Sequence, residues 1–115
     1  MKNFILFLIL LSSSPLFSQF SLEGIWNTGE ENTKIEIIQT NNKWNGRIKS
    51  SENKSAQIGQ IILKDLKKEG KKWTGKIYAF KRKEWYEVEI FPSNSTLRLE
   101  IKVGFLSKTI KWTNM

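Results

Sequence analysis

A five-residue pattern occurs twice in this chain, as Trp44-Asn45-Gly46-Arg47-Ile48 and as Trp73-Thr74-Gly75-Lys76-Ile77. Side chains alternate between the two faces of a strand, so each copy places its tryptophan, glycine and isoleucine on one face. A glycine between large residues on a strand face is typical of a bend, a bulge or a close approach of another segment. The repeat therefore predicts a small curved sheet or barrel, and it carries no chemistry of its own.

The first 18 residues have the layout of a secretory signal peptide. Lys2 supplies the positive start, residues 4–11 form an unbroken apolar run, residues 12–15 break it, and Ser18 offers a small residue for cleavage. The apolar run is far shorter than the roughly 18 residues that indicate a membrane span. We therefore expect an exported protein, periplasmic or extracellular. The alternative is a buried strand or helix at the N-terminus.

Removal of residues 1–18 leaves one domain, residues 19–115, of a common size. The sequence contains no cysteine, so neither a disulfide nor a cysteine-linked lipid anchor is available. The core must supply the stability, and five tryptophans provide material for it: Trp26, Trp44, Trp73, Trp85 and Trp112. We expect Trp26, Trp44 and Trp112 to fill the core; lining a cavity for a small apolar ligand is the alternative.

Short alternating runs separated by turn residues predict eight strands. They cover residues 22–28, 33–40, 43–49, 57–66, 71–80, 84–91, 96–103 and 105–113. No segment has a convincing helical period, although residues 58–68 are the least clear. Eight such strands with one apolar face predict an all-β, antiparallel, up-and-down barrel or a strongly curled sheet.

The sequence also predicts the register of two hairpins. Asn41-Asn42 suits a two-residue turn because asparagine tolerates positive φ. This turn places Ile35 opposite Ile48 and Glu36 opposite Arg47, so apolar residues meet on one face and opposite charges on the other. In the second hairpin, a four-residue loop at 92–95 places Val88 opposite Leu99 and Glu89 opposite Arg98.

Several short segments together resemble the DUF2147 family of exported bacterial proteins. In chain order they are Gly24-Ile25-Trp26, the two five-residue repeats, Ile62-Leu63-Lys64-Asp65-Leu66, Gly104-Phe105-Leu106 and Lys111-Trp112-Thr113. The resemblance covers about residues 22–114. It implies a lipocalin-like β-barrel, and it implies no activity because none is assigned to the family.

One segment departs from the pattern of that family. After the second repeat the family usually has Asp-Pro, a turn containing glycine, and a tyrosine. This chain reads Ala79-Phe80-Lys81-Arg82-Lys83-Glu84-Trp85-Tyr86 there, and only Tyr86 matches clearly. A function carried by this loop in the family would be lost or altered in this chain.

The absence of histidine excludes Ser-His-Asp and Cys-His catalytic sites and His-ligated zinc or iron centres. Asp65 is the only aspartate, and the pair Glu30-Glu31 fits a solvated turn better than a calcium site. With no phosphate-binding loop or dinucleotide motif either, we expect no cofactor and no metal. The alternative function is that of a glycan-acting hydrolase with two glutamate carboxylates in a cleft.

The chain is strongly basic. Lys2 is one of 19 basic residues, so the mature chain retains 18 against 11 acidic ones. An anionic partner such as a polyanionic glycan or lipopolysaccharide would explain this excess. Solubility and protection of strand edges are the simpler explanation, which we favour. Nucleic acid is not expected, because we expect the chain to be exported and because only three of the basic residues are arginine, the side chain suited to bidentate phosphate contacts.

A candidate contact site lies in the segment that departs from the family pattern, and it consists of Lys81, Arg82, Lys83 and Trp85. Alternation along the strand places Trp85 on the outside. An exposed indole beside three positive charges suits an anionic, amphipathic target such as a lipid headgroup or an acidic sugar. The alternative is a solvated turn with Trp85 packed on a neighbouring strand.

Taken together, these observations lead us to expect a monomeric, non-enzymatic envelope protein that binds a small apolar or amphipathic ligand or a cell-surface component.

Overall fold

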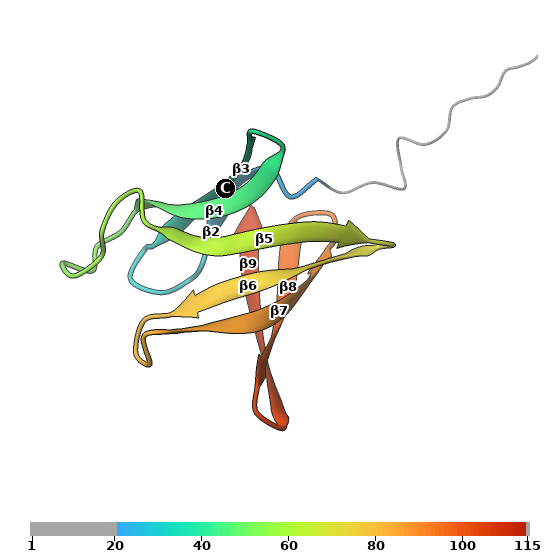
Figure 1. Cartoon of the computed structure of the whole chain (residues 1–115). Helices are drawn as coiled ribbons and strands as arrows, with labels where there is room; N and C mark the ends of the chain where they lie inside the picture. The colour runs from blue at the N-terminus through green and yellow to red at the C-terminus, as the bar shows by residue number, and fades with distance from the viewer. Residues whose placement is uncertain (1–20, 115) are drawn as a thin grey trace, which may run out of the picture.

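The computed structural model describes residues 21–114, which form eight antiparallel strands closed into one barrel (Figure 1). The strands are β2 (Gly24–Asn27), β3 (Lys34–Thr40), β4 (Lys43–Ser50), β5 (Ile61–Glu69), β6 (Lys72–Ala79), β7 (Glu84–Pro92), β8 (Thr96–Val103) and β9 (Leu106–Asn114). Each strand pairs with the next, and β2 pairs with β9 to close the barrel. The predicted all-β, up-and-down barrel is confirmed. The predicted signal peptide, residues 1–18, lies outside the described residues.

The hairpin β3–β4 has the predicted register. The two residues of Asn41-Asn42 adopt φ angles of 53° and 66°, the left-handed conformation that a two-residue hairpin turn requires. Ile35 lies opposite Ile48. Glu36 and Arg47 lie opposite each other and form an ion pair with a nitrogen–oxygen distance of 3.3 Å.

The predicted register of the hairpin β7–β8 is wrong by two residues. The partners differ from the predicted ones: Val88 lies opposite Ile101 instead of Leu99, and Glu89 lies opposite Glu100 instead of Arg98. The reason is that β7 continues through Pro92, and the turn is closed by a hydrogen bond from the Ser93 N–H to the Thr96 carbonyl at 2.9 Å. A shift of two residues keeps every side chain on its predicted face.

Strand β5 has the largest difference in strand boundaries, and it contains a β-bulge. Strand β5 covers residues 61–69, whereas the sequence predicted 57–66. The register against β6 shifts by one residue between Lys64 and Lys67, and Asp65 between them has a φ of 55°. The extra residue breaks the alternation of faces. This explains why the segment lacked a clear strand pattern in the sequence.

Apolar side chains from every strand fill the barrel. The buried set consists of Leu22, Trp26, Ile35, Ile37, Ile48, Ile62, Leu63, Leu66, Ile77, Val88, Ile90, Leu97, Leu99 and Trp112. Trp26 and Trp112 are therefore core residues, as predicted. Trp44 is only partly buried and packs edge-on against Trp73, with ring centroids 5.5 Å apart. Since the core residues occupy the inside, contacts with other molecules are best sought on the outer surface.

The connections between strands alternate between the two ends of the barrel (Figure 1). One end, called the long-loop end here, carries the connections 28–33, 51–60, 80–83 and 104–105. The other, called the short-turn end, carries 41–42, 70–71 and 93–95. Within residues 21–114, the large exposed apolar side chains all lie in or next to connections at the long-loop end: Ile58, Ile61, Phe80, Phe105 and Leu106. No helix in this range is long and apolar enough to cross a membrane.

Candidate functional site

The turn at residues 80–83 presents the basic residues of the candidate contact site to solvent. It is closed by a hydrogen bond from the Lys83 N–H to the Ala79 carbonyl at 2.7 Å, and Lys83 adopts a φ of 56°. Lys81, Arg82 and Lys83 are all exposed. In the part of the chain that the structure describes, none of the three forms a salt bridge. Their charges are therefore available to a partner.

Trp85 lies on the outside of the barrel, as predicted, but it packs in a cluster of rings. Its ring centroid lies 5.3 Å from that of Tyr78, the residue opposite it on β6. The ring of Phe80 lies at the same centroid distance of 5.3 Å from Tyr78. Lys64 completes the cluster, since its Nζ lies 4.1 Å from the Trp85 ring centroid, within the range of a cation–π contact.

We call this cluster the aromatic-basic patch; its members are Lys64, Tyr78, Phe80, Lys81, Arg82, Lys83 and Trp85. Trp85 is half-buried because it packs on the neighbouring strand, which was the alternative expectation. Phe80, which is 49% exposed, is the most exposed ring of the patch. The turn therefore combines free positive charge with an accessible ring.

Sequence reasoning missed three members of the patch, namely Tyr78, Phe80 and Lys64. A signal for Tyr78 was present, because it follows the buried Ile77 and so has the parity of an outward residue. Pairing the strands on either side of the turn at residues 80–83 would have placed Tyr78 opposite Trp85. Lys64 gave no such signal, because the bulge in β5 hides the register between β5 and β6.

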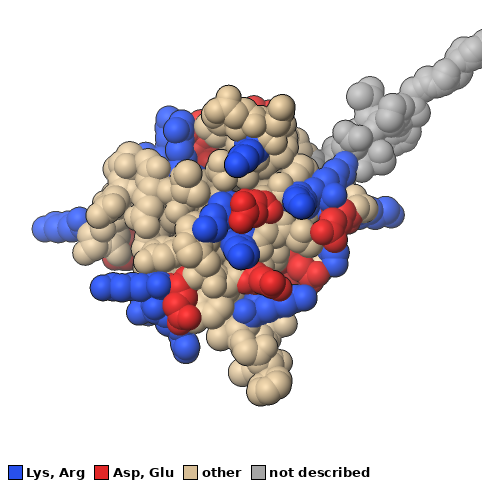
Figure 2. Space-filling view, in the orientation of Figure 1, with Lys and Arg blue, Asp and Glu red and all other residues tan. Residues whose placement is uncertain are grey.

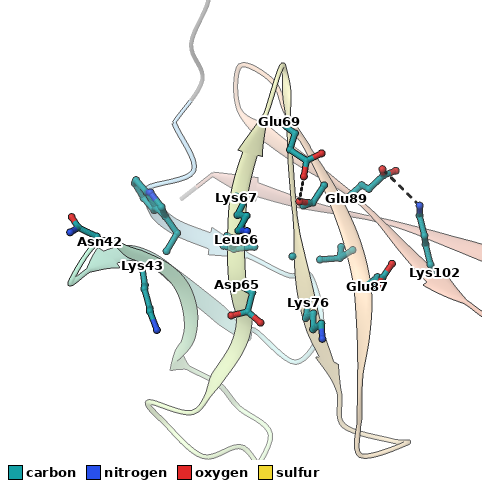
Figure 3. A pocket seen from close by; sticks show the side chains of 14 residues that line it. Asn42, Lys43, Asp65, Leu66, Lys67, Glu69, Lys76, Glu87, Glu89 and Lys102 are labelled. Carbon is teal, nitrogen blue, oxygen red and sulfur yellow. Dashed lines mark hydrogen bonds and ion pairs between the residues drawn. The ribbon is translucent and has the colours of Figure 1, made fainter.

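A second candidate is an open groove of about 690 Å³ over β5, β6 and β7 (Figure 3). Its charged lining has both signs: Lys43, Asp65, Lys67, Glu69, Lys76, Glu87, Glu89 and Lys102. Trp44 contributes apolar surface, whereas Leu66 and Val88, which also line the groove, are core residues with almost no exposed surface. Figure 2 shows acidic and basic side chains alternating over this face of the molecule. Because the two signs are mixed, this surface would not attract ions of one sign in preference to the other.

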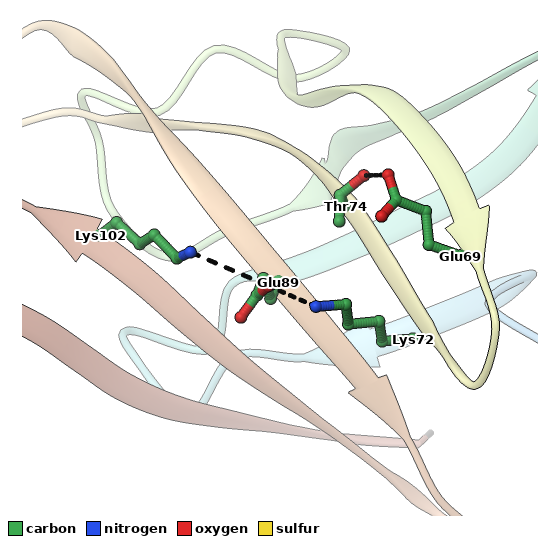
Figure 4. A network of polar contacts seen from close by, with 5 residues as sticks. All are labelled: Glu69, Lys72, Thr74, Glu89 and Lys102. Carbon is green, nitrogen blue, oxygen red and sulfur yellow. Dashed lines mark hydrogen bonds and ion pairs between the residues drawn. The ribbon is translucent and has the colours of Figure 1, made fainter.

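Glu89 is the centre of a polar network in the groove (Figure 4). Lys72 donates a hydrogen bond to its carboxylate over 2.6 Å, and the Nζ of Lys102 lies 3.8 Å from the same oxygen. Beside it, the Thr74 hydroxyl donates to the Glu69 carboxylate at 3.0 Å. The bond from Lys72 lowers the pKa of Glu89 below the usual 4.5, and the same bond raises the pKa of Lys72 above 10.5.

Glu89→Gln should slightly destabilise the protein at neutral pH and have no such effect in acid. The ionised Glu89 contributes stability above its unfolded-state pKa, and this contribution is lost as pH falls through the lowered pKa of the folded state. The effect is small because both side chains of the Lys72–Glu89 pair stay partly exposed. Urea midpoints from pH 7 down to pH values below 4.5 measure it. Glu87→Gln is the control, and a difference from wild type that is constant with pH would contradict the assignment.

Glu89 does not suit the acid role in a glycosidase that uses two glutamates. Such an enzyme needs one carboxylic acid with a raised pKa and a second carboxylate across the scissile bond. The pKa of Glu89 is shifted in the opposite direction, and Glu69 accepts a hydrogen bond from Thr74. Among residues 21–114, no group of His, Cys, Asp or Glu side chains is placed to hold a metal ion. The groove therefore gives the alternative hydrolase function little support.

Comparison with known proteins identifies a family for this chain. A family model described as "Uncharacterized protein conserved in bacteria (DUF2147)" matches residues 24–114, which include all eight strands. No curated protein and no solved structure matches the chain. The family match spans the aromatic-basic patch and the groove alike.

Proposed function

This chain belongs to the DUF2147 family of uncharacterised bacterial proteins, and we propose that it is an exported, non-enzymatic envelope protein that binds an anionic, amphipathic component of the cell surface. Export is inferred from the layout of residues 1–18. The binding site is the aromatic-basic patch. The observation that carries the proposal is that three cations, which form no salt bridge within residues 21–114, stand next to an exposed ring on one turn.

The chemistry of the patch fits such a partner in two ways. Lys81, Arg82 and Lys83 attract negative charge, and their exposure lets them reach a phosphate or carboxylate at a small desolvation cost. Phe80 and the half-buried Trp85 supply a surface on which an acyl chain or a sugar ring can pack. A partner with both an acidic group and an apolar part gains from both contacts.

The filled core supports binding on the outer surface. Leu99, Ile90 and Ile37 have no exposed surface at all, and they come from three different strands. Protein interiors of this kind are close-packed, so a ligand inside the barrel would have to displace them. The turn at residues 80–83 requires no such rearrangement.

Replacing Lys81, Arg82 and Lys83 together by serine should lower binding to isolated bacterial envelope fragments on the order of tenfold at low salt, since each cation contributes up to about 1 kcal/mol at an anionic surface. Co-sedimentation of the purified protein with the fragments measures the effect. Binding of the wild-type protein should weaken as salt rises, because the contact is exposed and electrostatic.

The matched control is the replacement of Lys67, Lys68 and Lys71 by serine. These three lysines are also exposed, and they lie at the short-turn end of the barrel. The control variant loses the same charge and should retain most of the binding. Equal losses in the two variants would show that net charge alone drives association, and the proposal for the patch would then be wrong.

A further inference from the structure

The hairpin made by the ends of β8 and β9 projects from the barrel as a two-stranded ribbon (Figure 1). Strand β8 pairs with β7 only as far as Ile101, but with β9 as far as Val103. On its other side, β9 pairs with β2 only at residues 113–114. Among the described residues 21–114, no third strand therefore lies beside residues 102–107, and we call residues 102–108 the hairpin tip.

The apex of the hairpin tip is apolar and exposed. Phe105 is fully exposed and Leu106 is 75% exposed, so neither side chain contributes to the core. Gly104, with a φ of 63°, makes the turn that brings both residues to the apex. Isolated two-stranded ribbons have little stability of their own, and adjacent exposed apolar residues reduce solubility. The fold therefore gains nothing from these two side chains, and a partner that covers them would explain their presence.

Positive charge surrounds this apolar apex. Lys102 and Lys108 lie on the two strands of the tip, and both are exposed; the Nζ of Lys102 also lies 3.8 Å from the Glu89 carboxylate. Glu100 is the last acidic residue of the sequence, so residues 101–115 carry only positive side-chain charge. The tip and the turn at residues 80–83 belong to the same, long-loop end of the barrel. This end thus combines apolar apices with cations.

We propose that the hairpin tip inserts into the surface of a lipid bilayer that contains anionic phospholipids. Phe105 and Leu106 would enter the boundary between headgroups and acyl chains, and Lys102 and Lys108 would remain at the level of the phosphates. A soluble acidic glycan would satisfy the lysines but would offer no apolar phase to the apex. The inference rests on the proposed function for the initial electrostatic attraction, and it goes further by naming a bilayer and a second contact surface.

The first test is sedimentation with vesicles of phosphatidylglycerol and phosphatidylcholine. The double variant Phe105→Ser, Leu106→Ser should bind at least about tenfold more weakly than wild type, because two apolar side chains no longer leave water. Its thermal unfolding should match that of wild type, since both positions are exposed. Vesicles of phosphatidylcholine alone should bind wild type more weakly than mixed vesicles do.

The second test uses the absence of cysteine from the chain. Ser107→Cys leaves the apolar apex intact and provides one attachment point for an environment-sensitive fluorophore. Asn94→Cys places the same fluorophore on the turn 93–95, at the short-turn end. With mixed vesicles, the fluorophore at position 107 should shift to shorter wavelength, and the one at position 94 should not.

Three results would overturn the inference. The first is that the protein does not bind mixed vesicles, or binds them without a wavelength shift at position 107. The second is equal binding by the double serine variant and wild type. The third is a dimer in solution that the double variant abolishes, which would make the tip a contact between two copies of the chain. The proposed function would survive each of these if the variant lacking Lys81, Arg82 and Lys83 still loses binding to envelope fragments.

Discussion

Replacing Trp26 by alanine should destabilise the barrel by about 3–5 kcal/mol, the usual cost of removing a buried tryptophan side chain. Trp26 is 2% exposed and lies opposite the buried Ile35. Its indole Nε1 also donates a hydrogen bond to the Leu22 carbonyl at 2.9 Å, and Leu22 is itself fully buried. The alanine variant would therefore have a cavity and an unpartnered carbonyl, and it would lose the contact that holds the segment before β2.

The total stability of a domain of this kind is about 5–15 kcal/mol, so such a loss is a large part of it. No disulfide can compensate, because the chain has no cysteine. Urea unfolding followed by far-ultraviolet circular dichroism measures the effect. Trp26→Phe should cost less because it keeps most of the buried area, and Trp85→Ala should cost less because that ring is half-buried on the outside. A Trp26→Ala variant as stable as wild type would contradict the packing described for this residue.

The two hairpins show what the sequence can and cannot predict about register. In β3–β4 the turn residues Asn41-Asn42 allow one short connection, and this connection fixes the pairing of Glu36 with Arg47. In β7–β8 apolar residues alternate along both strands, so registers two residues apart satisfy the pattern equally well. Pro92 was expected to end the strand, yet it is the last residue of β7. Turn composition alone did not distinguish the two registers.

The candidate site, like the register of the hairpins, could be predicted from the sequence only in part. The outward position of Trp85 followed from alternation along an uninterrupted strand, and the exposure of the basic turn followed from its place between two strands. The contact of Lys64 with Trp85 depends on the register across the bulge at Asp65, which adds one residue to β5. A bulge interrupts the two-residue alternation of side chains from which strand pairing is predicted. Contacts between residues on the two sides of a bulge therefore cannot be predicted from sequence spacing.

The two glycines of the repeat, Gly46 and Gly75, occupy the same position in the sequence pattern. The bulge makes the space around them differ. A Cβ added at Gly75 would lie 2.5 Å from Leu66 Cδ2 and 2.8 Å from the Lys64 carbonyl oxygen. A Cβ added at Gly46 would meet only side-chain atoms, of Leu63 and Ile35, at 3.0–3.2 Å. Side chains can move by a few tenths of an ångström, whereas a carbonyl held in the sheet cannot move without shifting β5.

Gly75→Ala should therefore destabilise the protein by about 1–3 kcal/mol or more, as overpacking in a filled interior does. Gly46→Ala should cost clearly less. Urea unfolding of the two variants beside wild type tests this order, and Lys76→Ala, next to Gly75 but on the outer face, controls for a general sensitivity of β6. Leu66→Ala should not rescue Gly75→Ala, because the contact with the Lys64 carbonyl would remain. Two results would contradict the close approach of β5 to β6 at Gly75. One is an equal loss of stability in the two glycine variants, and the other is rescue of Gly75→Ala by Leu66→Ala.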